Sequence, residues 1–513
     1  METQVLIIGA GVTGAGLARD LALRGIKCVV VEKGDVNAGA SGGNHGLLHS
    51  GARYVSNDSI SAQECRDEAR LLRRVAPECI EDTGGMFVAV AGDDESYISE
   101  FPQFCEKSGI AVSALDCQEA RDLEPALSET IIAAYLVEDA SVDPFRLSFD
   151  NLTQAESHGA SLLTHTQVIG IESKNNRINS VRLRQGPDGK EITVIADQVV
   201  NATGAWAGQV AALAGIQLPI ILSQGTLLVT QKRVTQRVVN RLRPPVDADI
   251  VVPGGTVSLV GTTSVRLNDL DHIQPSFSEV DFLVQECSKM LPVLEETRYI
   301  RAFAGVRPLV SLEASADDRS VSRGFVILDH ESDGLSNFVT VTGGKLTTYR
   351  LMAEKTADLV CGRLGVTSPC LTRELPLSMN DENKWVVAGL SPQQWLQHKS
   401  TNDALLCECE MVPISAVRQI IDHLSAHGAS VDLNAISLRS RLGKGPCQGA
   451  FCGLRAIAYL YETGEVEFDE GLDQMRSFLD RRWQGLRPVL WGAQLVQEQL
   501  QEAIHCGLLN LEL

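Results

Sequence analysis

Four cysteines in the last quarter of the chain form two closely spaced pairs. Cys407 and Cys409 are one residue apart, and Cys447 and Cys452 are separated by four residues. Thiolates grouped in this way are ligands of a [2Fe–2S] cluster or of a zinc ion. The Cys-x-Cys spacing is less usual for zinc, so the pattern favours the cluster, with zinc or a vestigial site without metal as the alternatives. The other cysteines are scattered along the chain and are expected to be free buried thiols.

A glycine-rich turn near the N-terminus has the pattern of a nucleotide site. Gly9-x-Gly11-x-x-Gly14 follows an apolar segment at 4–8 and precedes a helical segment at 15–24. The first glycine allows the tight turn, the second lets a pyrophosphate approach the backbone, and the third lets the helix pack on the sheet. The N–H groups at the start of the helix would then face the phosphates.

The segments that follow favour FAD over NAD. A second predicted strand, 27–32, ends at Glu32, whose carboxylate can accept hydrogen bonds from ribose hydroxyls. The later Ala202-Thr203-Gly204 resembles the second fingerprint of flavoproteins, and 41–46 fits a second backbone cradle. A simple NAD dehydrogenase needs neither. The residues predicted to bind FAD are Gly9, Gly11, Gly14, Glu32, Lys33, Ser41, Gly42, His45, Gly46, Leu48, Ala202, Thr203, Gly204, Gly343, Gly344, Leu346 and Thr347.

Three cationic residues lie beside these glycine turns: Arg53, Arg307 and Lys345. A phosphate dianion needs several cations or N–H donors that converge from different segments. Tyr54 and Thr347 would add hydroxyl donors. A single Arg or Lys is more often a solvated surface charge, but the position of these three next to the predicted flavin site favours binding of a small phosphorylated substrate.

One histidine is a candidate for proton transfer. Oxidation of a secondary alcohol needs the C–H bond aimed at flavin N5 and a base for the O–H proton. His49 lies between the predicted flavin cradle and Arg53, so it is predicted to act as the base or to orient the alcohol. The alternative is a structural histidine bonded to the backbone. His45 is a candidate for contact with the flavin itself.

Three motifs resemble those of FAD-dependent glycerol-3-phosphate dehydrogenases. His49-Ser50-Gly51-Ala52-Arg53-Tyr54 resembles their H-x-G-x-R-Y motif, Gly305-Val306-Arg307-Pro308 their G-x-R-P segment, and 342–350 their C-terminal flavin and phosphate motif. The resemblance covers about residues 3–365. It continues into the cysteine-containing segment, which the aerobic single-subunit enzymes lack. The chain is therefore similar to the A subunits of the anaerobic, multi-subunit enzymes.

The resemblance implies a function. Glycerol 3-phosphate would be oxidised to dihydroxyacetone phosphate by hydride transfer to flavin N5, and electrons would pass through a [2Fe–2S] cluster and partner subunits to a membrane quinone. The implied catalytic residues are His49, Arg53, Tyr54, Arg307, Lys345 and Thr347, and the implied cluster ligands are Cys407, Cys409, Cys447 and Cys452. One alternative is a 2-hydroxyacid or amine oxidoreductase of the same fold. Another is an electron-transfer or metal-sensing protein with a vestigial flavin domain.

The expected fold is α/β. It comprises an FAD-binding Rossmann-like domain of the D-amino-acid-oxidase and glycine-oxidase type, an inserted α+β substrate domain, and a small helical C-terminal iron–sulfur domain that resembles bacterioferritin-associated ferredoxin. Three widely separated strand-to-glycine turns indicate that insertions interrupt the nucleotide-binding domain. The predicted division is 1–75, 141–215 and 321–370 for FAD, 76–140 and 216–320 for substrate, 371–402 for a linker, 403–460 for the cluster, and 461–513 for a helical tail.

Composition excludes several other classes of protein. The 513 residues are 44% hydrophobic and 21% charged, as in ordinary globular proteins. The net charge of −20 disfavours binding to nucleic acid or directly to anionic lipid. No targeting segment and no uncharged run of 18 residues is visible, so no membrane span is expected. We expect a cytoplasmic protein that reaches the inner face of the cell membrane through partner subunits.

Overall fold

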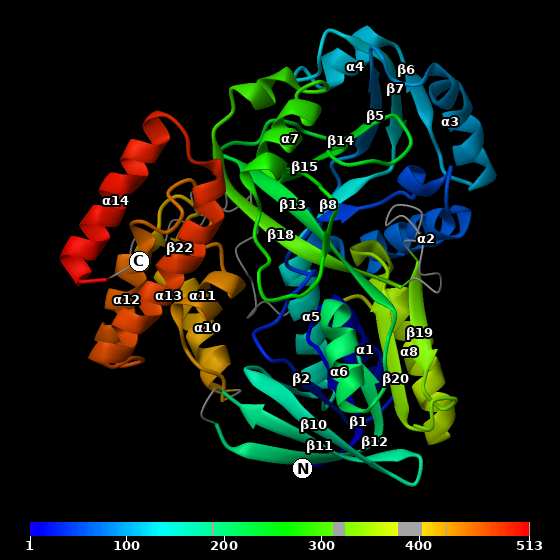
Figure 1. Ribbon diagram of the computed structural model, residues 1–513, viewed down its shortest axis with the longest axis vertical. Coiled ribbons are helices and arrows are strands. Elements are labelled where there is room, and N and C mark those ends of the chain that lie inside the picture. Colours follow the sequence, from blue (N-terminus) through cyan, green and yellow to red (C-terminus); the bar gives the residue numbers. More distant parts are fainter. Residues whose placement is uncertain (187–188, 311–323, 378–402, 427, 512–513) are drawn as a thin grey trace.

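The nucleotide-binding part of the chain is built on a parallel sheet. The computed structural model describes residues 1–186, 189–310, 324–377, 403–426 and 428–511, and Figure 1 shows their arrangement. The parallel strands lie in the order β9-β2-β1-β12-β20. Nearly every residue of β1 and β2 is buried, as expected for strands covered on both faces. Their bounds are β1 (Glu2–Ile8), β2 (Cys28–Val31), β9 (Ser161–Leu163), β12 (Glu191–Asn201) and β20 (Phe338–Gly343).

Three helices cover one face of this sheet and a hairpin covers the other. Apolar side chains of α1 (Val12–Leu23), α5 (Pro144–Ser157) and α8 (Tyr349–Leu364) share one core with the strands. The opposite face packs against α6 (Ala207–Leu213) and the antiparallel pair β10 (Thr166–Lys174) and β11 (Arg177–Gln185). β19 (Phe325–Asp329) pairs antiparallel with β20 at the edge.

A second sheet of nine strands lies over the first, above it in Figure 1. Its longest pair is β13 (Ile220–Thr230) and β18 (Tyr299–Val310), which run antiparallel along their whole length. The other strands are β5 (Gly85–Val90), β6 (Ser113–Leu115), β7 (Ile131–Val137), β14 (Val238–Arg241), β15 (Ile250–Gly254), β16 (Val257–Gly261) and β17 (Val265–Leu267). The helices around it are α3 (Glu95–Lys107), α4 (Cys117–Leu123) and α7 (Phe277–Cys287).

A small sheet and a helix connect the two large sheets. β3 (Leu47–Leu48) and β4 (Ile80–Glu81) both pair with β8 (Ala140–Val142). The N-cap of the helix α2 (Ser59–Val75) is Asp58, whose side chain accepts a hydrogen bond from the Ser61 amide.

The C-terminal part is a helical domain with its own core. Its strands are β21 (Leu405–Cys407) and β22 (Val412–Pro413), and its helices are α10 (Ile414–Ala426), α11 (Leu433–Arg439), α12 (Cys452–Glu462), α13 (Phe468–Leu486) and α14 (Ala493–Leu509). Met475 and Phe478 of α13 are fully buried against Ile421 and Leu460. The segment 461–513, assigned to a separate tail from the sequence, therefore shares one core with 403–460.

The C-terminal domain docks on the nucleotide-binding domain. The guanidinium of Arg439 pairs with the carboxylate of Asp35, and it lies 4.9 Å from the centre of the Phe149 ring in α5. Of the predicted linker, residues 371–377 pack on the nucleotide-binding domain, where the Leu377 amide donates to the Val75 carbonyl. The remainder, 378–402, lies outside the described residues.

Candidate active site

A cavity of about 1450 Å³ lies between the parallel sheet and the β13–β18 pair. Pockets for single small ligands are usually about 300–1,000 Å³, so this one has room for a dinucleotide and a small substrate together. Most of the predicted site residues line it: Gly9, Gly11, Glu32, Lys33, Ser41, His45, His49, Arg53, Tyr54, Ala202, Thr203, Gly204, Arg307, Gly343, Gly344, Lys345 and Leu346.

The remaining predicted residues support the wall from behind: Gly14, Gly42, Gly46, Leu48 and Thr347. A side chain at Gly14 would begin 1.9 Å from the Gly9 carbonyl oxygen, so glycine is needed for the helix to pack on the turn. Thr347 is fully buried, and its hydroxyl accepts a hydrogen bond from the His49 amide at 3.1 Å. Thr347 thus positions the histidine segment and does not itself face the cavity.

The start of α1 forms an anion site at the cavity wall. Gly9 has φ +105°, and a side chain there would begin 2.7 Å from the Ala202 carbonyl oxygen. The helix N-cap is Gly11, which has no side chain to cap the helix, and the first turn contains no acidic residue. The positive end of the helix dipole therefore faces the cavity with no acidic residue in its own first turn, which suits a pyrophosphate.

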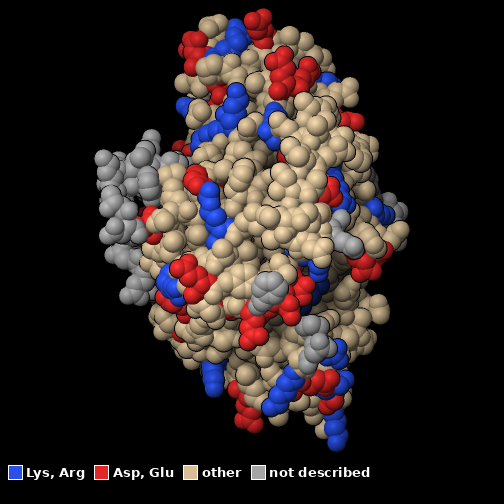
Figure 2. All heavy atoms as spheres, turned by 90° about the vertical axis from the view of Figure 1, so that its left-hand side faces the viewer, with Lys and Arg blue, Asp and Glu red and all other residues tan. Residues whose placement is uncertain are grey.

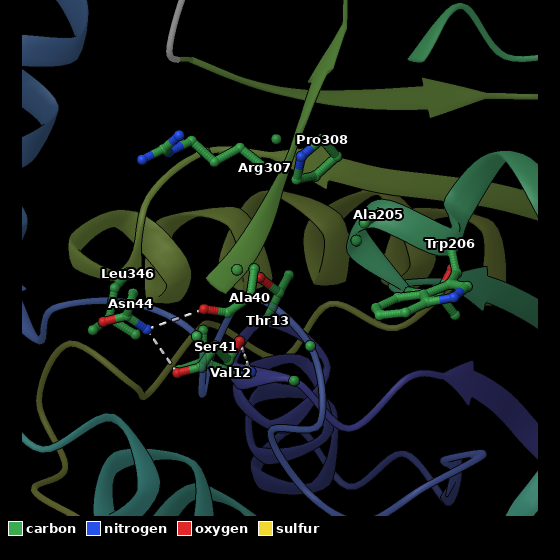
Figure 3. Close-up of a pocket in the computed structure, with 18 of the residues that line it drawn as sticks. Val12, Thr13, Ala40, Ser41, Asn44, Ala205, Trp206, Arg307, Pro308 and Leu346 are labelled. Atoms are coloured by element: carbon green, nitrogen blue, oxygen red, sulfur yellow. Dashed lines mark hydrogen bonds between the residues drawn. The ribbon is translucent and has the colours of Figure 1, made fainter. Parts of the chain in front are cut away.

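The segment after β2 forms the predicted second cradle. The Ser41 hydroxyl accepts from the Val12 amide at 3.0 Å, and the Asn44 amide group donates to the carbonyls of Ala40 and Ser41 (Figure 3). Gly43 lies against β18 so closely that a side chain on Gly305 would begin 2.0 Å from the Gly43 carbonyl oxygen. These contacts fix the segment after β2 in place, so that its backbone and small side chains form one wall of the cavity.

Glu32 has a structural role that the sequence did not predict. Its two carboxylate oxygens accept from the Ala10 amide at 3.0 Å and the Gly34 amide at 2.9 Å. The carboxylate therefore ties the end of β2 to the glycine turn. Each oxygen can accept a second hydrogen bond, which leaves capacity for a ribose hydroxyl.

Sequence reasoning missed Trp206 at the far end of the cavity. Its ring lies 3.9 Å from the Lys33 ammonium group, and in Figure 3 it stands opposite Arg307. Its position two residues after Gly204 of the second fingerprint is the one signal that could have indicated it.

At the other end of the cavity Arg53 is held by a buried carboxylate. Its Nη2 donates to Asp249 Oδ2 at 2.9 Å and to the Val246 carbonyl at 3.0 Å, while its Nη1 is buried without a hydrogen-bond partner. Asp249 is fully buried and also pairs with Arg243 at 2.8 Å. One face of the Arg53 guanidinium is thus fixed by protein and the other is available to a ligand. No sequence signal connects Asp249 with Arg53.

The other two predicted cations face the same cavity. Arg307 projects from β18, and its guanidinium donates to the Thr263 carbonyl at 3.1 Å and to the Thr262 hydroxyl. The Lys345 ammonium group lies 4.5 Å from the centre of the Tyr54 ring. The three cations come from three segments far apart in the chain.

Two buried histidines lie among these cations. Burial, together with the charges of Arg307 and Arg53, lowers the pKa of His45 to about 3, and its Nδ1 is buried without a hydrogen-bond partner. Burial, His45, Arg53 and Lys345 hold the pKa of His49 well below 6.5. The His49 ring packs edge-on against Tyr54, with 5.4 Å between ring centres. Both imidazoles are therefore neutral at pH 7.

The fold and this cavity define a flavin-dependent oxidoreductase. The sequence matches the FAD dependent oxidoreductase family over residues 4–359. Glycine oxidase from Geobacillus kaustophilus has a similar structure, with TM-score 0.57 and 22% identity over 70% of this chain and 94% of that one. The fold class expected from the sequence is confirmed. The glycine turn, the start of α1 and the second cradle fit FAD.

A relative of high sequence identity identifies the branch of this family, and a second solved structure shares its fold. The A subunit of the anaerobic glycerol-3-phosphate dehydrogenase of Escherichia coli K12 is 41% identical, covering all of this chain and 97% of its own length. The glycerol-3-phosphate dehydrogenase of Bacillus halodurans, solved with FAD, has TM-score 0.64 and 18% identity over 96% of each chain. The chain belongs to the family of anaerobic glycerol-3-phosphate dehydrogenase A subunits, which confirms the resemblance inferred from its motifs.

Proposed function

We propose that this chain oxidises sn-glycerol 3-phosphate to dihydroxyacetone phosphate, and that the electrons pass through a [2Fe–2S] cluster and partner subunits to a membrane quinone. The observation that carries the substrate assignment is the buried, unpartnered Nη1 of Arg53 at the end of the cavity where Arg307 and Lys345 also lie. The names of the relatives support the same substrate.

The cationic residues bind the phosphate in this proposal. A dianion can use several charge-assisted hydrogen bonds, whereas a single Arg often suffices for the carboxylate of a 2-hydroxyacid. Asp249 holds the Arg53 guanidinium in place, so little side-chain freedom is lost when substrate binds. Phosphate binding near His49 would also raise the pKa of His49, because a nearby negative charge stabilises its protonated form.

His49 takes the proton of the C2 hydroxyl at an imidazole nitrogen in this proposal. It is neutral before substrate binds, and the hydrogen bond from its amide to the Thr347 hydroxyl fixes its backbone. When bound, FAD supplies the hydride acceptor for the hydrogen on C2. Loss of that hydride and of the hydroxyl proton converts the secondary alcohol to the ketone.

The arrangement of the four cysteines supports the cluster assignment. The sulfurs of Cys409 and Cys447 lie 3.6 Å apart, and the thiols of Cys407 and Cys452 form a second hydrogen-bonded pair. Within the described residues, no group of three or more His, Cys, Asp or Glu side chains is arranged to hold a metal ion. In the proposed cluster, each of the two thiol pairs would supply two ligands to one of the two irons.

The backbone around the cysteines also fits a cluster. The Gly443 amide donates to the sulfurs of both Cys407 and Cys452. Gly445 approaches so closely that a side chain there would begin 2.6 Å from Cys409 Cβ. Such N–H···S contacts tune cluster potential in iron–sulfur proteins. The cluster would accept electrons from the flavin site and deliver them to the partner subunits, which would hold the chain at the inner face of the membrane.

Kinetics with a substrate panel test the substrate assignment. The purified enzyme should reduce an artificial dye with glycerol 3-phosphate and not with lactate or glycine. Arg53→Ala should raise the apparent KM for glycerol 3-phosphate about 30-fold or more, since loss of one partner from a buried charged contact is costly. FAD content should be unchanged. Arg177→Ala, at an exposed Arg on β11, is the matched control. Turnover of lactate or glycine without turnover of glycerol 3-phosphate would refute the proposal.

A further inference from the structure

The last helix, α14, has the reverse of the usual orientation for a surface helix. Its buried positions are Glu498 and His505, both polar. Its outward positions include Val496, Leu500 and Ile504, whose exposed fractions are 66%, 63% and 53%, and Leu508, at 68%. A surface helix normally turns its apolar stripe to the core and its polar residues to water.

Polar contacts fix this orientation. The Gln494 side chain donates to the Tyr299 carbonyl at 3.1 Å, and the Glu498 carboxylate lies 3.6 Å from the Arg298 guanidinium. His505 is buried, with its Nε2 3.2 Å from the Ala450 carbonyl oxygen. Rotation of the helix to bury its leucines would break all of these contacts. The outward apolar stripe is therefore a fixed part of the folded chain.

We define the α14 face as Trp491, Leu495, Val496, Leu500, Ile504 and Leu508. All six side chains are more than 40% exposed, and four of them recur at intervals of four residues along one side of the helix. Figure 2 views the molecule from the α14 side and shows a broad area with few charged side chains. A contiguous exposed apolar surface of this kind marks an interaction site.

The helix α14 packs, through its buried side, on the segment that leads into Cys452. His505 contacts Ala450, and the next two residues are Phe451, which is 63% exposed, and Cys452. Cys409 is itself exposed. A protein that docked on the α14 face would therefore sit beside the part of the chain from which electrons leave in the proposed function.

We propose that the α14 face is the docking surface for the electron-accepting partner subunit, which would present an apolar helix or groove to it. This rests on the proposed function, because it assumes that electrons leave at the cysteine pairs. The relatives are named as one subunit of a larger enzyme. A lipid surface is disfavoured, since α14 contains no Lys or Arg and the chain carries a charge of −20, whereas interfacial helices are rich in basic residues.

Membranes from cells that lack this chain but retain its partner subunits provide the test. Purified chain is added, and glycerol 3-phosphate-dependent reduction of the membrane quinone is measured beside dye reduction by the chain alone. In the variant Val496→Gln/Leu500→Gln/Ile504→Gln, quinone reduction should fall tenfold to a hundredfold, since apolar anchors dominate interfaces. Dye reduction and flavin content should stay within twofold of wild type, which excludes misfolding.

A matched control removes exposed apolar side chains elsewhere: Ile132→Gln/Ile195→Gln should leave both activities unchanged. The single variant Leu500→Glu should lose quinone reduction. The single variant Leu500→Met should keep it. Normal quinone reduction by the triple variant overturns the proposal. So does binding of wild type to protein-free vesicles of the extracted lipids, or a wild-type dimer in sedimentation that the triple variant abolishes. Absence of glycerol 3-phosphate-dependent dye reduction in wild type would instead refute the proposed function.

Discussion

The Lys444 ammonium group lies 4.6 Å from the centre of the Phe145 ring, and this contact links the cysteine loop to the cofactor cradle. Lys444 stands between Gly443, whose amide donates to cysteine sulfurs, and Gly445, which packs against Cys409. The Phe145 ring lies 3.2 Å from the point where a side chain on Gly42 would begin. One lysine and one aromatic ring thus span the space between the cysteine loop and the FAD cradle, and the docking of the C-terminal domain sets the distance between them.

The ion pair that anchors this docking should be important for stability. The side chains of Arg439 and Asp35 are only 4% and 14% exposed. Arg439→Ala would leave a largely buried carboxylate without its partner, which typically costs about 3–5 kcal/mol. We expect the free energy of unfolding, measured with urea, to fall by about that amount. The double variant Arg439→Ala/Asp35→Asn should recover part of the loss, and additive effects of the two single changes would contradict the pairing.

Gly9 should be essential for cofactor binding because of its surroundings. Gly9→Ala would combine a left-handed φ with a Cβ 2.7 Å from the Ala202 carbonyl oxygen. We expect the variant to purify with little FAD, as measured by its visible absorbance. Gly92→Ala separates the two effects, since Gly92 has φ +95° but nothing within 4 Å of its Cβ position. That variant should lose about 1–2 kcal/mol of stability and keep its FAD.

The sequence predicted those features that local patterns determine. The strand–glycine–helix pattern placed β1 and α1 within a few residues, because apolar runs and glycine turns are local signals. The contact of Arg53 with Asp249 joins residues 196 positions apart, and no pattern in the sequence predicts it. Similarly, the sequence indicated a helical tail at 461–513 but not the direction of the apolar face of α14, because neighbouring elements decide what a helix buries.

Stability should fall with decreasing pH because of the buried histidines. His45 has a pKa of about 3 in the folded protein and about 6.5 when unfolded, so below pH 6.5 the unfolded chain binds more protons. This contribution is present above pH 6.5 and is lost as pH falls toward 3, by up to about 1.4 kcal/mol per pH unit. The lowered pKa of His49 likewise contributes stability at neutral pH that is lost as the pH falls.

Urea unfolding at pH 7 and pH 5 tests the contribution of His45. His45→Asn should lose about 2 kcal/mol less than wild type between these two pH values. His272→Asn, at an exposed position, should lose as much as wild type. An identical loss in all three proteins would show that His45 is not held neutral in the folded state.

The cysteine pairs should be needed for electron transfer but not for substrate oxidation. Cys407→Ser/Cys409→Ser replaces one thiol in each of the hydrogen-bonded pairs Cys407–Cys452 and Cys409–Cys447, and serine is a poor iron ligand at neutral pH. We expect glycerol 3-phosphate to bleach the flavin at a wild-type rate in stopped flow, because the substrate residues lie on other segments. Quinone-linked turnover should drop sharply.

Metal analysis of anaerobically purified wild type decides what the cysteines hold. About two irons per chain, with matching sulfide, are expected for a [2Fe–2S] cluster. Cys506→Ser is the control for the variant, since Cys506 lies on α14 and is not among the four paired thiols; it should keep full iron content. Zinc without iron would overturn the cluster. In that case the Cys407→Ser/Cys409→Ser variant would lose stability and not electron transfer alone, because a structural zinc contributes directly to the folding free energy of its domain.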